Sequence, residues 1–401
     1  MRHFFLKAIS CILIWAMFSC QIPPDIPPFV ITTTVLDNGN SVRVDWPLVN
    51  DSRLGTVRYD VFLGNSQLAS NITANTFTIN NLAFNTTYTG TLVGKASTGD
   101  TESMDFTFTT GKEYILIPDA GFEQALITGG QDTEGILNGK MIKADAEAAS
   151  KIDASGYNIS NSSGLQYFIN LIEADFSNNK LKTIDFGQNR AIRKLNLGKN
   201  ELTNLNFSPN TSLVELYVFN NLLNQLNITQ CVNLEVLVAD NNKLAALDIN
   251  SLNKLKAIGL SFNSLSNISI SAKSQLESLD LSSNPYSTIN ISTLGNLEDF
   301  VCKACQLSTL NTSSNSKLRL LNVSGNKLTS VNLASNLLLK TIDVSNNRLT
   351  ALSVKPLTSL IYLNTQNNTN LLNICVPNVT TATDNFDWVK DLQTNYISNC
   401  N

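Results

Sequence analysis

Hydrophobic residues recur at a fixed interval along the C-terminal two-thirds of the chain. A leucine or isoleucine stands at every 21st position and opens the arrangement L-x-x-L-x-L-x-x-N-x-L. The ten opening positions are Leu171, Ile192, Leu213, Leu234, Leu255, Leu276, Leu297, Leu318, Leu339 and Leu360. The central L-x-L predicts a short strand whose alternate side chains point inward. A period of this length predicts a solenoid in which each unit forms one coil.

The asparagine of the pattern forms a second column. It recurs at Asn179, Asn200, Asn221, Asn242, Asn263, Asn284, Asn326, Asn347 and Asn368, and Cys305 takes its place once. The sharp turn after each strand buries backbone N–H and C=O groups that have no helical partner. A side-chain amide can satisfy both kinds of group in every coil. Period and pattern are those of leucine-rich repeats, and we expect the strands to form one parallel sheet with coils about 4.8 Å apart.

The repeats predict a solenoid over residues 171–372. With one degenerate unit before Leu171, eleven coils would extend over roughly 50 Å. A unit of 21 residues leaves little room for an α-helix, so extended or 3₁₀ segments are expected opposite the sheet. The ends of an apolar column must be covered. We therefore expect an N-terminal cap at 112–170 and a C-terminal cap at 373–401.

The two caps differ in what their residues predict. In the first, Asp119 is the expected N-cap of a short helix that continues to Ile127. In the second, the apolar spacing over Trp388–Tyr396 predicts an amphipathic helix. Cys375 and Cys400 bracket this last segment, and a disulfide between them would add about 3 kcal/mol of stability.

Residues 29–111 alternate polar and apolar side chains in short runs separated by turn residues. This pattern predicts an antiparallel β-sandwich, so the fold class is mainly β: a sandwich followed by a solenoid. The stretch Leu82–Tyr88 resembles the L-x-P-x-T-x-Y segment of fibronectin type III domains, with Phe84 in place of the proline. The resemblance implies a tyrosine corner at Tyr88 and core aromatics at Trp46 and Tyr59. It implies a spacer domain.

The N-terminus has the pattern of an export signal. Arg2 and Lys7 precede an apolar run that is too short to span a bilayer, which predicts a signal peptide at 1–19. The signal ends at Ser19-Cys20 and resembles a lipobox, which implies a lipid anchor on Cys20; cleavage near Ser19 and secretion is the alternative. Residues 20–28 contain two Pro-Pro pairs, which favour an extended tether.

Three further cysteines lie inside the repeats. Cys302 occupies an inward apolar position, Cys305 an asparagine position, and Cys231 another inward position. A C-x-x-C pair invites a zinc site, but no second pair is present in the sequence to complete one. Buried thiols are the favoured interpretation, and a local disulfide between Cys302 and Cys305 is the alternative.

The sequence offers few groups for catalysis. Its single histidine, His3, lies in the expected signal, which removes histidine bases, triads and histidine metal ligands from the mature chain. No nucleotide-binding or hydrolase motif occurs. The formal charge is −4 and no run of Lys or Arg is present, which argues against a nucleic-acid partner. We expect a monomeric protein that is not an enzyme and uses no cofactor or metal.

Outward positions of neighbouring strands carry unusual side chains. Most are small or polar, but one group is aromatic or apolar with a carboxylate at its edge: Tyr217, Phe219, Val236, Val238, Asp240 and Phe262. Exposed aromatics on a rigid sheet are typical binding anchors. We predict that this group on the concave face contacts a ligand. Lateral packing, or variation without selection, is the alternative of equal weight.

The repeats, the Ile117-Pro118-Asp119 segment and the C-terminal Cys…Trp…Tyr…Cys resemble exported leucine-rich repeat proteins of Gram-negative bacteria, and distantly internalins. The resemblance implies a lipoprotein at the outer membrane or cell surface, or a secreted or periplasmic protein as alternatives. It implies non-catalytic recognition or adhesion with a protein ligand. A glycan-binding accessory lipoprotein of a polysaccharide uptake system is the alternative function.

Overall fold

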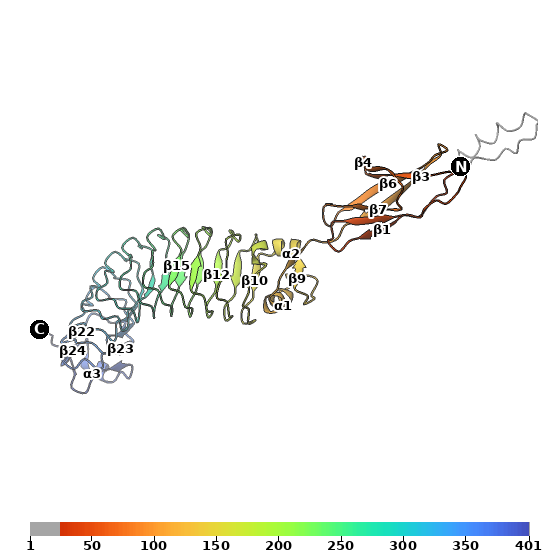
Figure 1. The fold of residues 1–401 in the computed structure, drawn as a ribbon. Coiled ribbons are helices and arrows are strands. Elements are labelled where there is room, and N and C mark those ends of the chain that lie inside the picture. Colours follow the sequence, from red (N-terminus) through yellow and green to blue (C-terminus); the bar gives the residue numbers. More distant parts are fainter. Residues whose placement is uncertain (1–24, 401) are drawn as a thin grey trace, which may run out of the picture. The chain divides into compact units, whose positions relative to one another are not determined.

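The computed structural model describes residues 25–400 and divides the chain into two compact units between Glu113 and Tyr114 (Figure 1). The expected signal, Cys20 and the first half of the tether lie outside the described residues. Among the described helices none is long and apolar enough to cross a membrane. Each unit is described by itself below.

The first unit consists of two antiparallel sheets. The three-stranded sheet has the order β1-β2-β5 and the four-stranded sheet the order β4-β3-β6-β7. Their strands are β1 (Thr32–Val35), β2 (Val42–Asp45), β3 (Val57–Leu63), β4 (Ser66–Ile72), β5 (Thr76–Ile79), β6 (Thr87–Ala96) and β7 (Thr101–Thr109). Alternate side chains of β2 and of the second half of β6 are buried, as the period-two pattern predicts. The fold is an antiparallel β-sandwich.

Aromatic side chains fill the centre of this sandwich. The rings of Trp46 and Tyr59 lie 5.3 Å apart and both residues are buried. The Tyr88 hydroxyl accepts a hydrogen bond of 3.0 Å from the Ala83 N–H, which is the contact of a tyrosine corner. Ile26 is only 3% exposed and packs in the same core. The packed unit therefore includes part of the predicted tether.

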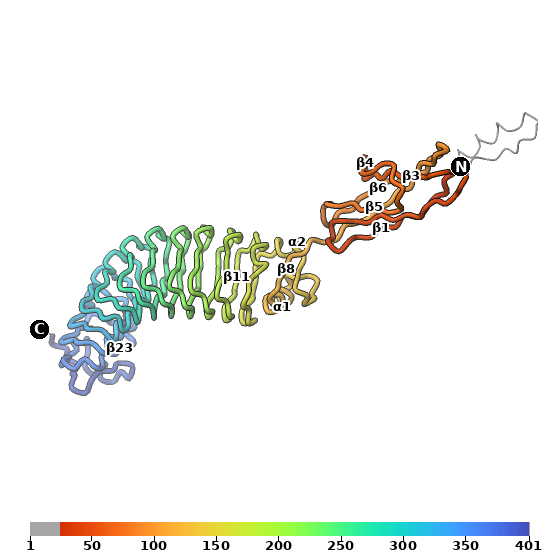
Figure 2. The backbone as a smooth tube through the Cα atoms, viewed as in Figure 1, coloured from red at the N-terminus to blue at the C-terminus, as the bar shows by residue number. Residues whose placement is uncertain are grey.

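The second unit is a solenoid whose strands form one parallel sheet (Figure 2). Neighbouring strands are offset by one repeat, so that Leu216 pairs with Leu237 and Leu237 with Ile258. The strands are β10 (Lys151–Asp153), β11 (Glu173–Asp175), β12 (Lys194–Asn196), β14 (Glu215–Tyr217), β16 (Val236–Val238), β17 (Ala257–Gly259), β18 (Ser278–Asp280), β19 (Asp299–Val301), β20 (Leu320–Asn322), β21 (Thr341–Asp343), β23 (Tyr362–Asn364) and β25 (Trp388–Val389). Twelve strands are present, where eleven coils were predicted. The additional strand, β25, comes from the C-terminal cap.

The repeat leucines form a continuous apolar core along the solenoid. Leu216, Leu237 and Ile258 are between 0% and 2% exposed, which confirms the predicted inward row. The opposite side has turns and short extended segments instead of α-helices, as the repeat length predicts. The extended segments are β13 (Asn204–Asn206), β15 (Gln225–Asn227), β22 (Leu352–Ser353), β24 (Asn373–Cys375) and β26 (Asn395–Ile397).

The asparagine column acts as a hydrogen-bond ladder between coils. Asn221 is typical: its Nδ2 donates to Leu197 O at 2.9 Å and to Val218 O at 3.1 Å. Its Oδ1 accepts from the Leu202 N–H at 3.0 Å. The same contacts recur at the same spacing in the coils before and after. The predicted role of the asparagine is confirmed: it satisfies buried backbone groups of adjacent coils.

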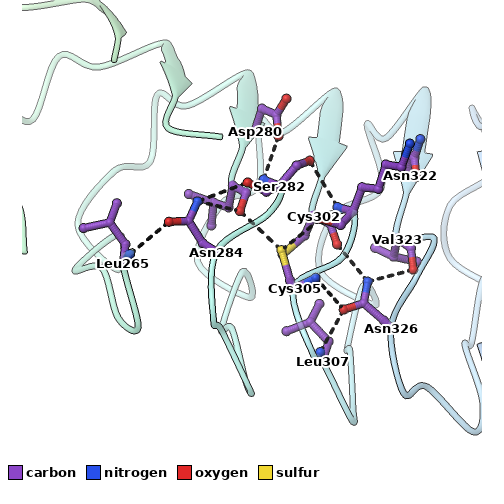
Figure 3. The surroundings of a disulfide bond; sticks show 12 residues. Leu265, Asp280, Ser282, Asn284, Cys302, Cys305, Leu307, Asn322, Val323 and Asn326 are labelled. Atoms are coloured by element: carbon purple, nitrogen blue, oxygen red, sulfur yellow. Dashed lines mark hydrogen bonds between the residues drawn. A yellow bond between two sulfur atoms is a disulfide. The ribbon is translucent and has the colours of Figure 1, made fainter. Parts of the chain in front are cut away.

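Cys305 interrupts the ladder, and a disulfide to Cys302 lies at that point (Figure 3). The favoured prediction of free thiols is therefore wrong, and the alternative of a local disulfide is the one observed. The Cα atoms are 5.7 Å apart, which is within the range that a disulfide spans. The sulfur of Cys305 lies 3.2 Å from Leu281 O, where an amide nitrogen lies in other coils. The free thiol of Cys231 is buried.

The N-terminal cap covers the first coil. It contains β8 (Tyr114–Leu116), α1 (Ala120–Thr128), β9 (Lys140–Ile142), α2 (Lys143–Ala148) and the 3₁₀ turn η1 (Leu165–Tyr167). Asp119 caps α1 as predicted, because its side chain accepts from the Phe122 N–H at 3.1 Å. Phe122 is fully buried against the solenoid core.

The C-terminal cap differs from its prediction. Trp388–Tyr396 is not a helix; it contains β25, a turn and the start of β26, and the helix of this cap is α3 (Val379–Thr383). β25 pairs with β23, so it closes the open edge of the sheet, which a helix would leave unpaired. The Trp388 indole N–H donates to Ile361 O at 3.0 Å. The predicted disulfide between Cys375 and Cys400 is present.

Candidate functional site

A column of capping residues runs along the exposed face of the twelve-stranded sheet. Its asparagines and aspartates each accept a hydrogen bond from the backbone N–H two residues later. The members are Asp175, Asn196, Asp280, Asn322, Asp343 and Asn364, with distances of 2.8 to 3.1 Å. The polar character of this face therefore has a structural cause, an Asx turn in each of these six coils.

The coil of Val301 lacks this cap, and so do three consecutive coils. The column holds Tyr217, Val238 and Gly259 there, and none of them offers a short side-chain acceptor. One loss is compensated across coils, since Asp240 Oδ1 accepts from the Ser261 N–H at 2.6 Å. Tyr217 donates its hydroxyl to Glu215 Oε2 at 3.0 Å, which takes the phenol away from the turn. The stabilising pattern is thus absent from three neighbouring coils and, separately, from the coil of Val301, where the Ser282 hydroxyl accepts from the Lys303 N–H at 3.1 Å.

Tyr217 and the two valines lie side by side. Tyr217 pairs with Val238, and Glu215 pairs with Val236, on the adjacent strands β14 and β16. Tyr217, Val236 and Val238 are all half-buried. Together with Phe219 they form an apolar area that we call the sheet-face patch. The structure brings these four predicted residues together.

The ring of Phe219 lies close to the backbone of Gly198 in the preceding coil. A Cβ atom built on Gly198 would be 2.5 Å from the Cε1 and Cζ atoms of Phe219, so the ring occupies the place of a side chain. Every other member of that outward column has a side chain, most often serine. Gly198 is therefore needed for close approach of the ring.

The carboxylate of Asp240 does not extend from the rim of the patch. It accepts from both the N–H and the hydroxyl of Ser261, each at 2.6 Å, and it covers Gly259. Burial raises the pKa of this carboxyl, and the hydrogen bonds from Ser261 offset part of that shift. Asp240 thus supports the turn beside the patch.

Phe262 lies at the end of the strand face, in the turn. It is 61% exposed and its φ is 53°, in the left-handed region that bulky residues avoid. Leu222 is a further exposed apolar residue, 40% accessible, in the turn of the coil that carries Phe219. The alternation of strand positions does not reveal Leu222. The signal that finds it is a leucine in a column whose other members are charged or polar residues and one proline.

Ion pairs border the sheet-face patch. Lys194 Nζ lies 3.0 Å from Glu215 Oε2, and Lys256 Nζ lies 2.8 Å from Glu235 Oε2. A shallow hollow of about 350 Å³ extends from Tyr217 over the strands of the first coils. These charged pairs are exposed, so each contributes little to stability, at most about 1 kcal/mol.

The remaining acidic and apolar side chains of this face form smaller groups. Within residues 25–400 no group of three His, Cys, Asp or Glu side chains is placed to hold a metal ion. The second acidic column, which includes Asp185 and Asp248, caps turns in the same way as the first. A smaller apolar group on the same sheet, Val301, Leu320 and Tyr362, is scattered among polar residues.

Neither the protein-family models nor the curated proteins contain a match to this chain. Solved structures do. The functional domain of InlJ from Listeria monocytogenes, which includes a cysteine ladder, is 21% identical, with 70% of each chain covered and a TM-score of 0.60. The internalin InlF from Listeria monocytogenes is 17% identical; 71% of this chain and 96% of that chain are covered, with a TM-score of 0.53. Residues 114–400 therefore form a leucine-rich repeat solenoid with the fold of internalin domains.

Proposed function

We propose that the protein recognises a protein ligand, without catalysis, through the sheet-face patch of Tyr217, Phe219, Val236 and Val238. One observation carries this proposal. In three consecutive coils, Tyr217, Val238 and Gly259 replace the capping residue that most other coils carry; Val301 is the one further exception in the repeats. Residues that break a local structural rule without a gain in stability gather at functional sites.

The geometry of the patch supports this role. Phe219 and Tyr217 are held on a sheet, so they lose little conformational freedom when a ligand covers them. Gly198 makes room for the ring of Phe219, and the ion pairs around the patch form a polar rim. An apolar centre within a polar rim is the usual arrangement of a protein interface.

A glycan ligand is the second candidate, and one observation favours it. The ring of Phe219 lies over Gly198 and the residue is only half-buried, so part of the ring is accessible. A flat aromatic face can pack against the apolar side of a sugar ring. We also propose that the protein is exported and lipid-anchored at Cys20, and that its N-terminal sandwich is a fibronectin type III spacer; the Tyr88 contact and the strand order support that assignment.

The test uses the chain from residue 21 onward as a purified protein. Tyr217→Ser combined with Phe219→Ser should abolish retention of protein partners in cross-linking pull-downs, while the unfolding temperature of the solenoid stays within a few degrees. Tyr362→Ser is the matched control, because it removes an equally half-buried aromatic from the same sheet outside the patch. A glycan array with the same three proteins decides between the two ligand classes. Equal retention by wild type and double variant would reject the patch.

A further inference from the structure

The turns beside the sheet-face patch form a row with left-handed backbone. One residue per coil has φ between 52° and 60° over a long part of the solenoid, and backbone N–H groups join successive members to the next coil. Four consecutive members are Lys199, Asn220, Asn241 and Phe262, and we call them the edge row. Asparagine tolerates this conformation, and Asn241 Nδ2 donates to Asn220 Oδ1 at 2.6 Å. The row thus has its own preferred residue.

Phe262 violates that preference. It is the only aromatic residue among the left-handed positions of the repeats. Its side chain is 61% exposed, so packing within the chain does not offset the strain. An aromatic ring held in a strained turn and directed to solvent has no stabilising role in the isolated molecule. The feature becomes favourable only when another surface covers the ring.

Two further features extend this edge. Leu222 is 40% exposed, three residues after Phe219, so apolar surface continues from the sheet face onto the turns. Lys199 and Lys243 lie on either side of it, and both are exposed. Within the described residues neither lysine has a carboxylate at ion-pair distance, unlike Lys194 and Lys256 on the opposite border.

The charge of the edge is opposite to that of the chain. The turns over residues 178–184, 199–203, 220–224, 241–245 and 262–266 contain four lysines and one glutamate, whereas the whole chain carries −4. A positive border without internal partners favours a ligand that brings carboxylates. An apolar centre between Leu222 and Phe262 favours a ligand that also brings apolar side chains.

We infer that the edge formed by Leu222, Phe262, Lys199 and Lys243 docks an acidic, apolar segment of a partner protein. This inference rests on the proposed function and names the chemistry of its ligand. Leu222 and Phe262 contact the apolar side chains of the segment, and the two lysines pair with its Asp or Glu side chains. The segment lies across the turns next to the sheet-face patch. A glycan bound at the sheet-face patch would not need to contact this edge.

The probe is a pair of matched peptide sets on an array, in which apolar residues alternate with Asp and Glu in one set and with Lys in the other. The wild-type chain should retain the acidic set and not the basic set. Lys199→Glu with Lys243→Glu should weaken binding of the acidic set at least about tenfold and reduce its salt dependence. Equal retention of both sets by the wild type would overturn the inference.

Phe262→Asn supplies a second readout that a structural role would not produce. It should weaken peptide binding about tenfold, because one exposed aromatic anchor is lost. It should also raise the unfolding temperature by about 2 °C, because asparagine suits the left-handed turn. Lower stability with unchanged binding would contradict the inference. If only Tyr217→Ser with Phe219→Ser affects partner retention, the proposed function stands and the edge inference fails.

Discussion

Two columns of polar side chains run along the same coils, and they tolerate change differently. The buried asparagine ladder is interrupted once, at Cys305, and a disulfide lies at that point. The exposed capping column lacks its acceptor in three consecutive coils and again at Val301; Asp240 compensates at Ser261, and the Ser282 hydroxyl compensates at Lys303. A buried group has to find a partner in the protein, whereas water can satisfy an exposed one. The exposed face is therefore free to exchange stability for binding.

The largest effect should come from breaking the buried column. Asn221→Ala leaves the Leu202 N–H without its acceptor and removes one donor from Val218 O. We expect a loss of about 3 kcal/mol in the unfolding free energy of the solenoid. Guanidinium denaturation followed by circular dichroism measures it. Asn224→Ala, an exposed asparagine three residues later, should change the free energy by less than about 0.5 kcal/mol; similar losses in the two variants would refute the ladder's role.

The next effect concerns the end of the buried core. Cys375→Ser with Cys400→Ser opens a loop of 25 residues, and we expect a loss of about 3 kcal/mol, confined to the C-terminal cap and its nearest coils. Hydrogen exchange should show faster exchange in β24 and β26 and unchanged exchange in β12. Uniform loosening along the solenoid would show that the cap is not a local unit.

A smaller effect should come from repairing the exposed column. Val238→Asn restores a capping acceptor and should stabilise the solenoid by about 0.5 kcal/mol. The reverse change, Asn322→Val, removes the acceptor that Ser324 uses through both its N–H and its hydroxyl. It should destabilise by about 1 kcal/mol. Thermal unfolding of both variants measures the two changes in stability. Changes of the same sign would show that the capping residues do not determine stability.

The smallest effect is a pH dependence of stability that comes from Asp240. Burial raises the pKa of Asp240, so the folded state binds its proton more tightly than the unfolded state does. Stability from this group is present at acidic pH and is lost as the pH rises from the ordinary carboxyl range through the raised pKa. Asp240→Asn should therefore be more stable than wild type at pH 7, with the difference shrinking toward pH 3. A difference independent of pH would exclude titration of Asp240 as its cause.

The repetitive part of the fold could be predicted from the sequence because a strict period fixes the register of every coil. That reasoning located the inward leucines and the asparagine ladder. The Asp119 cap and the Cys375–Cys400 bridge lie outside the period, and they followed from the N-cap preference of aspartate and from the position of the two cysteines. It failed at Trp388–Tyr396, where no period remains and a short apolar spacing fits either a helix or a strand. Pairing of β25 with the open sheet edge decided the outcome, and that is a long-range effect.

The candidate site could be predicted only in part. The aromatic and aliphatic strand positions followed from the alternation of side chains, and the structure brings Tyr217 and Val238 together. The left-handed backbone at Phe262 could not be predicted in this way, because the identity of a single residue does not determine its φ angle. The exposure of Leu222 was missed for a related reason: turn residues have no alternation to indicate which side they face.

Within the repeats, backbone hydrogen bonds join each coil to the coil before and the coil after. A segment one period long, such as residues 318–338, can in principle be excised so that the flanking coils meet with their leucines and asparagines still aligned. The recognition surface can therefore gain or lose length by duplication or deletion in frame with the period, while the cluster around Phe219 keeps its own neighbours. Such a scaffold allows the length of the solenoid to evolve separately from the residues that would determine its specificity.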